Sequence, residues 1–580
     1  MTIAPATSRP VAGSRGLFAN LDTPEPLERL FGDPRDPHNP LGFEAIVAAD
    51  ERGDLPSGGE RMLDAFGLGA EFVPARLGGR LREADRLAQV LRPLFRRDAA
   101  LGLGHGASNL VGSVNVWSAG NADQQRWLAD ILLRNGRIAA AYTDMATGND
   151  VARSDFQGRV HGQELLLSGR KEIINNIARA EAVTVLARTS EEPGSRSHSM
   201  VLVDRAALPR DRVRFLPRYR TVGVRGMYLG GVEFQDCPVP LDAVAGRLGE
   251  AFETILRAFQ VTRATLPAAA VGTLDTQIRT VLDFALERRL YGRTVAALPH
   301  ARSVLTGAFL DLLICDSFAT TVCRALHLLP QQTSVYSAAV KFLVPLLMRD
   351  AVDELATVLG ARSFLREGPH AIFQKHLRDL PIASLVHAGG TVCQATIIPQ
   401  LPRLARKSWL TGPGAPAELF QLDTPLPELD MERLGISSAR DDQLLATLTE
   451  VAAEAGTDGP LRDLCTTLIG ELTELKRRCA DLAPRDRTPV ASPSSFAYAE
   501  RYSLLLAAAS CLGVWRHNQS RPSTFLADTH WLTAALGRLA VRLGHPPVSG
   551  LDGIESKVFD ELVRRHGENR DFDLIGRRFI

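Results

Sequence analysis

Cysteine is scarce in this chain, and no two cysteines have the CxxC spacing of a metal-binding or redox motif. The 580 residues contain seven cysteines, at positions 237, 315, 323, 393, 465, 479 and 511. Cysteines scattered in this way favour neither a zinc site nor a disulfide framework, and they suit a reducing compartment. We therefore expect no metal site and a cytoplasmic location.

An excess of charge of either sign is also lacking. Lys and Arg number 67 and Asp and Glu 66, which gives a net charge of +1. No overall field draws such a chain to nucleic acid or to an anionic membrane. The N-terminal stretch MTIAPATSRPVAGSRG has no apolar core behind its charges, and the nearly apolar run Leu504 to Trp515 is too short to span a bilayer. We expect a soluble protein with no nucleic-acid partner and no membrane span.

The length of the chain predicts several domains, because a single core rarely serves 580 residues. Helical spacing, as in Phe252, Ile255, Leu256 and Phe259, flanks a central region of short Val- and Leu-rich runs such as AVTVLAR. These patterns predict an arm over 1–42, a helical domain over 43–137, a β domain over 138–246, a helical bundle over 247–411 and a helical extension over 412–580. The expected fold class is α+β multidomain, with a barrel-like β domain between two helical domains.

The extension carries one clean apolar stripe at helical spacing. Its members are Leu461, Leu464, Cys465, Leu468, Ile469, Leu472 and Leu475. Exposed stripes of this kind are uncommon, so we expect it to be buried against its own bundle or a partner.

Six segments resemble, in order, the landmarks of the acyl-CoA dehydrogenase superfamily. They are LGAEFVPARLGG (68–79), GNADQQRWLADILLRNGRIAAAYTD (120–144), AYTDMATGND (141–150), LSGRKEIINN (167–176), VGVRGMYLGGVEFQDCPVP (222–240) and FALERRLYG (284–292). The resemblance covers roughly residues 45 to 400. It implies a three-part fold with FAD between the β domain and the C-terminal bundle. It also implies an acyl thioester substrate carried by CoA or a carrier protein, and a homodimer or homotetramer whose subunits share each cofactor site.

The resemblance assigns the cofactor to particular positions of this chain. They are Tyr142, Thr143, Gly148, Asn149, Ile173, Asn175, Arg288, Tyr291, Thr357, Gly360 and Thr391. Tyr142 and Thr143 would lie against the flavin ring, and Gly148 and Asn149 would hold the pyrophosphate, because a glycine turn lets backbone N–H groups approach phosphates closely. Arg288 would come from the partner subunit.

The residues around the flavin depart from the family pattern at several points. Asn175 stands where the family has Thr or Ser near flavin N5, and Ile173 stands where an aromatic residue often covers the ring. VLGARSF (358–364) resembles a Gly-rich motif of the adenosine half, with Gly360 retained and Thr357 in place of glutamine. On the substrate side, the resemblance points to His105 and Arg263.

The tract SLVHAGGTVCQ (384–394) lacks the carboxylate that the resemblance leads us to expect as catalytic base. An ungapped register from Arg378 and Asp379 places His387 at that position, and a register on the Gly-Thr pair places Gly389 there. The alternative family position, immediately before Arg263, holds Thr262. A neutral imidazole accepts a proton at pH 7, since its ordinary pKa is about 6.5. His387 is therefore the candidate base.

Three functions are open on the sequence alone. The first is FAD-dependent α,β-dehydrogenation of an acyl thioester with a non-standard base. The second is a flavin-dependent monooxygenase of the same fold, which needs no α-deprotonation. The third is a non-catalytic subunit paired with an active paralogue. No motif identifies the electron acceptor.

Overall fold

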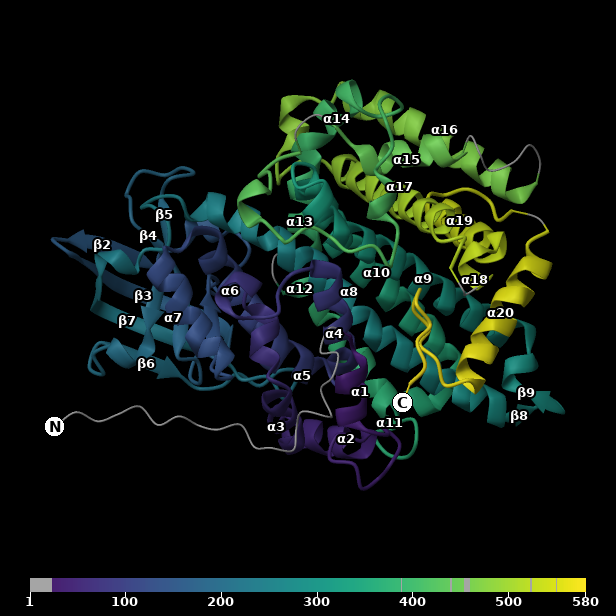
Figure 1. Ribbon diagram of the computed structural model, residues 1–580, viewed down its shortest axis with the longest axis horizontal. Helices are drawn as coiled ribbons and strands as arrows, with labels where there is room; N and C mark the ends of the chain where they lie inside the picture. The colour runs from purple at the N-terminus through teal and green to yellow at the C-terminus, as the bar shows by residue number, and fades with distance from the viewer. Residues whose placement is uncertain are drawn as a thin grey trace.

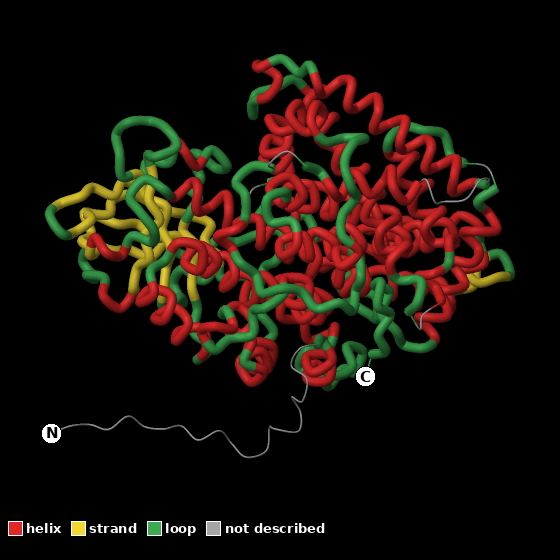
Figure 2. Tube along the Cα trace, turned by 45° about the horizontal axis from the view of Figure 1, so that its top comes forward, coloured by secondary structure: helices red, strands yellow, loops and turns green. Residues whose placement is uncertain are grey.

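The computed structural model describes residues 23–386, 389–438, 441–452, 459–521, 524–548 and 550–579. A β domain lies at one end of the molecule, and helices form the rest (Figures 1 and 2). The final helices of the chain cover the top and the far side of the helical part (Figure 1). The structure is thus α+β, with helical regions before and after a central sheet.

The N-terminal helices pack around the long helices of the central bundle. Their bounds are α1 (Glu25–Phe31), α2 (Phe43–Arg52), α3 (Ser57–Phe66), α4 (Ala84–Arg97), α5 (Ala99–Leu101), α6 (Ser108–Ala119) and α7 (Ala122–Leu133). Helix α7 begins at a capping box in which Asn121 and Gln124 bond each other's backbone N–H groups. Helix α1 lies inside the predicted arm and packs on α3 and α4, so this part of the arm is ordered structure.

The central sheet has seven strands. They are β1 (Ile138–Ala141), β2 (Gln157–His161), β3 (Glu164–Asn175), β4 (Ala182–Arg188), β5 (His198–Asp204), β6 (Val213–Leu216) and β7 (Leu229–Pro240). Their order is β1-β4-β2-β3-β7-β6, with β5 paired to β4. Strands β3 and β7 pair antiparallel with two irregularities, one of them between Lys171 and Ile174. Such bulges often re-aim side chains near functional sites.

A helical bundle follows the sheet. Its elements are α8 (Ala251–Glu287), α9 (Pro299–Leu328), α10 (Thr333–Leu359), α11 (Ala371–Asp379), α12 (Ile382–Leu385), α13 (Gly390–Ile397) and α14 (Leu401–Lys407), with a small hairpin of β8 (Arg289–Leu290) and β9 (Arg293–Thr294) after α8. Helix α9 is long and apolar enough to cross a membrane, but its apolar window is wholly buried in the fold, as in a core helix. The second such stretch, 371–407, is broken into the short helices α11 to α14.

The extension is helical and packs on the bundle. Its helices are α15 (Gln443–Ala452), α16 (Pro460–Ala480), α17 (Pro493–His517), α18 (Thr524–Ala527), α19 (Thr529–Arg542) and α20 (Asp552–Gly567). Five members of the predicted apolar stripe are buried on α16: Leu464, Cys465, Leu468, Leu472 and Leu475. Helix α16 packs against α14, α17 and α19, so the stripe is covered by its own chain.

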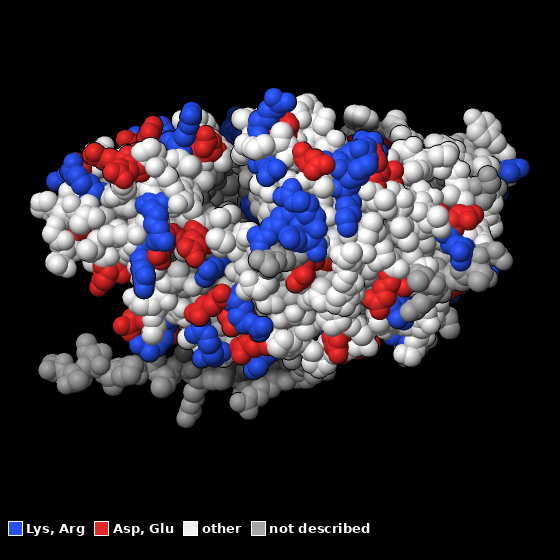
Figure 3. All heavy atoms as spheres, turned by 90° about the horizontal axis from the view of Figure 1, so that it is seen from above, with Lys and Arg blue, Asp and Glu red and all other residues white. Residues whose placement is uncertain are grey.

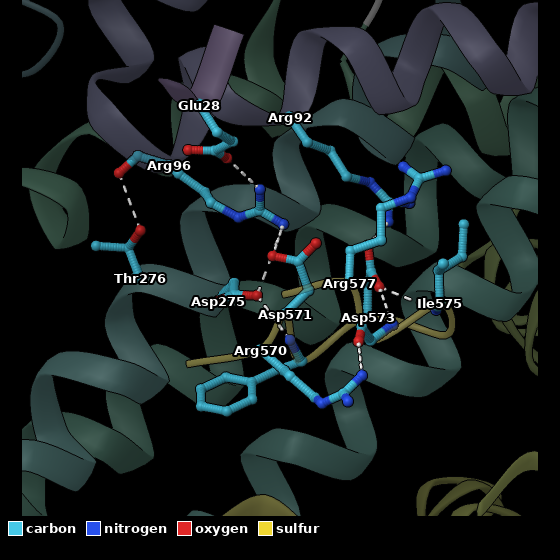
Figure 4. A network of polar contacts seen from close by, with 12 residues as sticks. Glu28, Arg92, Arg96, Asp275, Thr276, Arg570, Asp571, Asp573, Ile575 and Arg577 are labelled. Atoms are coloured by element: carbon cyan, nitrogen blue, oxygen red, sulfur yellow. Dashed lines mark hydrogen bonds and ion pairs between the residues drawn. The ribbon is translucent and has the colours of Figure 1, made fainter. Parts of the chain in front are cut away.

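The segment that follows α20 returns to the N-terminal helices through buried ion pairs (Figure 4). Arg92 on α4 contacts Asp573 at 2.7 Å and also pairs with Asp316 of α9. Arg96, one turn later, contacts Asp571 at 2.7 Å and Glu28 of α1 at 2.5 Å. All these side chains are nearly inaccessible to water. Removing one partner of a buried pair leaves an uncompensated charge, so this network fixes α1 and the C-terminal segment on one core.

Replacing Asp573 tests that network. We expect Asp573→Ala to lower the free energy of unfolding by about 3–5 kcal/mol, because Arg92 loses a buried carboxylate. Denaturant unfolding followed by circular dichroism measures it. The matched control is Arg126→Ala, which breaks an exposed pair with Asp123 and should change little. A loss in Asp573→Ala no larger than in the control would show that the C-terminal segment contributes no stability.

Candidate functional site between the β domain and the helical bundle

One rim of the site is the loop that follows β1. Lys171 is buried beneath it, and its Nζ donates to the carbonyl of Tyr142 at 3.1 Å and to Ser154 Oγ at 2.7 Å. Burial lowers the pKa of Lys171 to about 8. The Asp144 carboxylate accepts from the backbone and side chain of Thr147, and Gly148 turns the chain with φ +55°. Lys171 therefore supports the loop from its buried side. Thr143, Gly148 and Asn149 are exposed on its outer side.

The edge of β3 continues this rim. Ile173 has φ +55° and leaves 45% of its side chain exposed. Asn175 donates from Nδ2 to the carbonyl of Gly104 at 2.8 Å and to Ser108, whereas its buried Oδ1 has no hydrogen-bond partner in the described part of the chain. Gly104 belongs to a π-helical turn, Gly102–Ala107, of the kind often found at functional sites. The N-terminal helices thus orient one side of the rim.

Tyr142 points away from this surface. Its hydroxyl lies 2.7 Å from Asn115 Nδ2 and 2.8 Å from Thr184 Oγ1, and burial raises the pKa of the phenol above its ordinary value. Its ring contacts Phe259 of α8, with 6.0 Å between ring centroids. The backbone of Tyr142, rather than its side chain, borders the exposed loop.

The opposite rim comes from the helical bundle. Gly389 precedes α13, and a Cβ atom on Gly389 would lie 3.5 Å from Asn149 Nδ2. Thr391 is in the first turn of α13 and exposed. Beneath it, Lys341 of α10 is buried and donates from Nζ to the carbonyl of Ala383 in α12. The structure therefore brings the two sequence segments, 142–150 and 383–391, to the same place.

Arg263 lies one turn beyond Phe259 on α8 and is 4% exposed. Its guanidinium carbon lies 5.8 Å from the centroid of the Phe259 ring. Its Nε is buried without a hydrogen-bond partner, and no ion pair of Arg263 occurs among the described residues. Thr262, at the alternative position for a base, donates to the carbonyl of Phe259 in its own helix.

The predicted adenosine-side residues lie elsewhere. Arg288 ends α8 and is exposed, and Tyr291 in the following hairpin is 90% exposed. Arg362 stacks on Phe284, which places the exposed Gly360 and Phe364 beside the end of α8. Thr357 bonds the carbonyl of Glu354 in its own helix. These residues form a second exposed surface, separate from the loop at Gly148.

His105 does not face open space. Its Nδ1 lies 3.2 Å from Glu60 and its Nε2 lies 3.1 Å from Asp64, both on α3. Burial opposes the charged ring, but these carboxylates outweigh it and raise the pKa of His105 above its ordinary value. Arg179 of the β domain also contacts Glu60 at 2.8 Å. The geometry makes His105 part of a junction between domains rather than a substrate ligand.

His387, the predicted base, lies outside the described residues. Lys341 and Phe259, which the structure places at the site, were missed in the sequence, although a lone lysine in the apolar run SAAVKFLVPLL was a visible signal. A buried lysine in such a run needs a partner or a function.

The face above the site is hollowed between the β domain and the helical part, and Lys and Arg gather beside the hollow (Figure 3). Exposed basic side chains occur on α14, which packs against α16, and at the end of α16. They are Arg403, Arg406, Lys407, Arg477 and Arg478, which we call, together with Arg485 in the turn after α16, the basic cluster.

Two family models match the chain. The middle domain of acyl-CoA dehydrogenases matches residues 139–237, and their C-terminal domain matches residues 249–398. A probable acyl-CoA dehydrogenase of Mycobacterium tuberculosis is 24% identical over 259 residues, which are 44% of this chain and 65% of that relative.

Solved structures show the same fold. An acyl-CoA dehydrogenase of Bacillus anthracis complexed with FAD aligns with a TM-score of 0.70 at 15% identity, over 93% of this chain and 94% of that one, so its match includes the extension. The prolyl acyl carrier protein oxidase AnaB aligns with a TM-score of 0.55 at 15% identity, over 61% of this chain and 96% of that one. Both family domains occur in sequence order, and the matching sequences and folds together indicate the acyl-CoA dehydrogenase superfamily of flavoproteins.

Proposed function

We propose that this protein is an FAD-dependent oxidoreductase that dehydrogenates an acyl thioester between its α and β carbons. The observation that carries the proposal is that the loop after β1 and the edge of β3 lie next to the start of α13. The exposed edge of Thr143, Gly148 and Ile173 faces the segment that begins α13, where Gly389 stands beside Asn149. This is the boundary between the middle and C-terminal family domains.

The residues present fit FAD. Gly148 has a left-handed backbone, and a Cβ atom at this position would meet no atom within 4 Å, so its backbone is open to close approach by a phosphate. The buried Oδ1 of Asn175 lacks a donor among the described residues, and a flavin N–H would supply one. Thr143 and the aliphatic Ile173 offer an exposed edge to a flat ring. Thr143, Ile173 and Asn175 would thus hold the flavin, and Gly148 and Asn149 the pyrophosphate.

The chain's own residues supply position and proton transfer. Bound FAD supplies the acceptor for the hydride that leaves the β carbon. We assign His387 as the base that takes the α proton on a ring nitrogen, because no carboxylate occurs in residues 384–394. Lys341 holds the carbonyl of Ala383, which fixes the start of the segment that contains this histidine.

The thioester carrier is anionic in this proposal. CoA bears phosphates, and a carrier protein with an acidic surface carries its acyl group on a phosphopantetheine arm. The exposed basic cluster favours either one by charge complementarity. A structural relative is an acyl carrier protein oxidase, and other matches are acyl-CoA dehydrogenases.

Each cofactor site is completed by a second subunit in our proposal. Phe259 contacts Tyr142 beside the flavin end, whereas Arg288 ends the same helix 29 residues later. At 1.5 Å per residue this separation is about 43 Å, too long for one dinucleotide within one chain. The exposed Tyr291 and Phe364 beside Arg288 then belong to a subunit interface.

The cysteines support a reducing compartment. All seven are buried and none forms a disulfide. We therefore place the protein in the cytoplasm.

The purified protein should be yellow and release FAD rather than FMN on denaturation, identified by chromatography. Gly148→Val should lower FAD occupancy, since a β-branched residue is strained at φ +55°. Gly162→Val is the matched control: Gly162 has φ +61° and open space around it, but lies in the turn between β2 and β3. A colourless protein that cannot take up FAD would refute the cofactor assignment.

The dimer prediction is tested at the adenosine-side surface. We expect light scattering to give an even number of chains, and Tyr291→Glu with Phe364→Glu to yield monomers with reduced FAD content, because two charges desolvated at an interface disfavour association. Val490→Glu, at an equally exposed apolar residue of the extension, is the control. A monomer with full flavin occupancy contradicts the shared site.

The base is tested by His387→Ala. We expect FAD content to be unchanged and flavin reduction by an acyl thioester to fall by about 10²–10⁴-fold. In the wild type the rate should fall as pH drops below about 6.5, since only neutral imidazole accepts a proton.

Gly389→Glu tests the other register and should gain activity if Gly389 occupies the position of the base.

The same assay separates the other two functions. Anaerobic bleaching of the flavin by acyl thioesters supports dehydrogenation. Reduction only by a flavin reductase, followed by oxygen consumption, indicates a monooxygenase, and no reduction by either indicates a non-catalytic subunit. Full activity of His387→Ala on a substrate that bleaches the wild-type flavin would assign the histidine to packing.

A further inference from the structure

Two buried cations at the candidate site have no counter-ion among the residues that the structure describes. Arg263 is 4% exposed and Lys341 is 3% exposed. Within the part of the chain that the structure describes, no carboxylate lies within ion-pair distance of either. Among those same residues Lys341 bonds only the carbonyl of Ala383, and the buried Nε of Arg263 has no acceptor. The sequence supplies no acidic residue between Ser384 and Gln394 to neutralise them.

Most other strongly buried cations in this fold are neutralised, although Arg97, among the described residues, donates only to the backbone carbonyls of Leu41 and Gly32. Lys375 pairs with Asp98 and Asp379, Arg324 with Asp85, and Arg92 with Asp316 and Asp573. An unpaired charge in a protein interior costs several kcal/mol in solvation, which is why buried charges are normally paired. Arg263, whose buried Nε has no acceptor among the described residues, and the neighbouring Lys341 therefore point to an anion that arrives from outside the chain.

The two cations are close enough to influence each other. Burial, with a smaller contribution from the charge of Arg263, lowers the pKa of Lys341 to about 8. Ser337, one turn before Lys341 on α10, has a buried hydroxyl without a partner among the described residues. Helices α8 and α10 pack together along their length, and Gln260 of α8 accepts a hydrogen bond from Thr333 of α10 at 2.6 Å. An arginine, a lysine and a hydroxyl thus provide unused donors between two packed helices.

We propose that Arg263 and Lys341 bind a carboxylate carried by the acyl chain, so that the substrate class is a dicarboxylic acyl thioester. This proposal rests on the proposed function, because it assumes that the acyl chain enters between α8, α10 and α12. The acyl group is the part of a thioester that must reach the reacting centre, whereas CoA phosphates are strongly hydrated. A carboxylate is the anion that such a chain can bear at neutral pH, and it matches a guanidinium in geometry.

Matched thioesters test the proposal on the FAD-loaded protein. Adipyl-CoA and hexanoyl-CoA have equally long chains and differ in the terminal carboxylate. We expect the wild type to bind adipyl-CoA about 10- to 100-fold more tightly, measured by anaerobic perturbation of the flavin absorbance, because charge-assisted hydrogen bonds are of that strength. Arg263→Gln should reduce this preference to about twofold or less.

Three further variants separate binding from folding. Lys341→Met should also lose the preference, whereas Lys476→Met should keep it, since Lys476 likewise donates to a backbone carbonyl, that of Trp409, but lies in the extension. Arg263→Lys keeps the charge and should retain part of the preference. Circular dichroism and FAD content verify that each variant is folded.

The outcomes distinguish this proposal from the proposed function. If neither thioester binds, free adipate is titrated by calorimetry. Binding of adipate that Arg263→Gln abolishes would keep the anion site and reject the thioester function. Equal affinity for adipyl-CoA and hexanoyl-CoA in the wild type would overturn the proposal, as would a preference that survives Arg263→Gln. Arg263→Gln could instead lower turnover equally on both thioesters and leave the preference unchanged. The arginine would then stabilise the charge that develops on the thioester group during the reaction, and not a carboxylate of the acyl chain.

Discussion

The fold depends on neutralising two arginines on one face of α4. Arg92 and Arg96 are inside the protein, and their carboxylate partners come from four separate places: α1, α8, α9 and the C-terminal segment. Because each missing partner would leave a buried charge unpaired, α1 and the segment after α20 must both pack against α4 before the two arginines are neutralised. The extension is therefore a structural part of the bundle, and α4, which carries these arginines, leads directly into the π-helical turn that positions Asn175.

Position in the sequence says little about which buried charges are structural. Lys375 and Arg263 both lie on bundle helices near the candidate site, and both are almost inaccessible to water. Lys375 is matched by two carboxylates of its own chain, and the nearby Asp379 also accepts from the backbone N–H of Val224 in the β domain. The Arg-Asp landmark at 378–379 thus locks two domains together. Arg263, which lacks any such partner among the described residues, has no comparable structural reason to be charged.

The sequence was sufficient to predict the order of the domains and a loop at 142–150, because turn glycines and alternating apolar residues determine structure locally. It was also sufficient to predict that the apolar stripe of α16 is buried, but it left open whether the same chain or a partner covers it. It placed His105 on the substrate side, whereas the structure pairs it with Glu60 and Asp64, because long-range ion pairs leave no local pattern. The approach of Gly389 to Asn149 and of Arg263 to Lys341 depends on how α8, α10 and α13 pack, which periodicity alone does not determine.

The missing carboxylate and the unpaired cations have one electrostatic explanation. A glutamate base near Arg263 and Lys341 would carry the negative charge that these side chains lack, and its pKa would be held low by them. Without it, the charges of Arg263 and Lys341 leave the local field positive. The negative charge must then come from the ligand. In our proposals, the histidine base and the selection of an acidic acyl chain both follow from the absence of a carboxylate in residues 384–394.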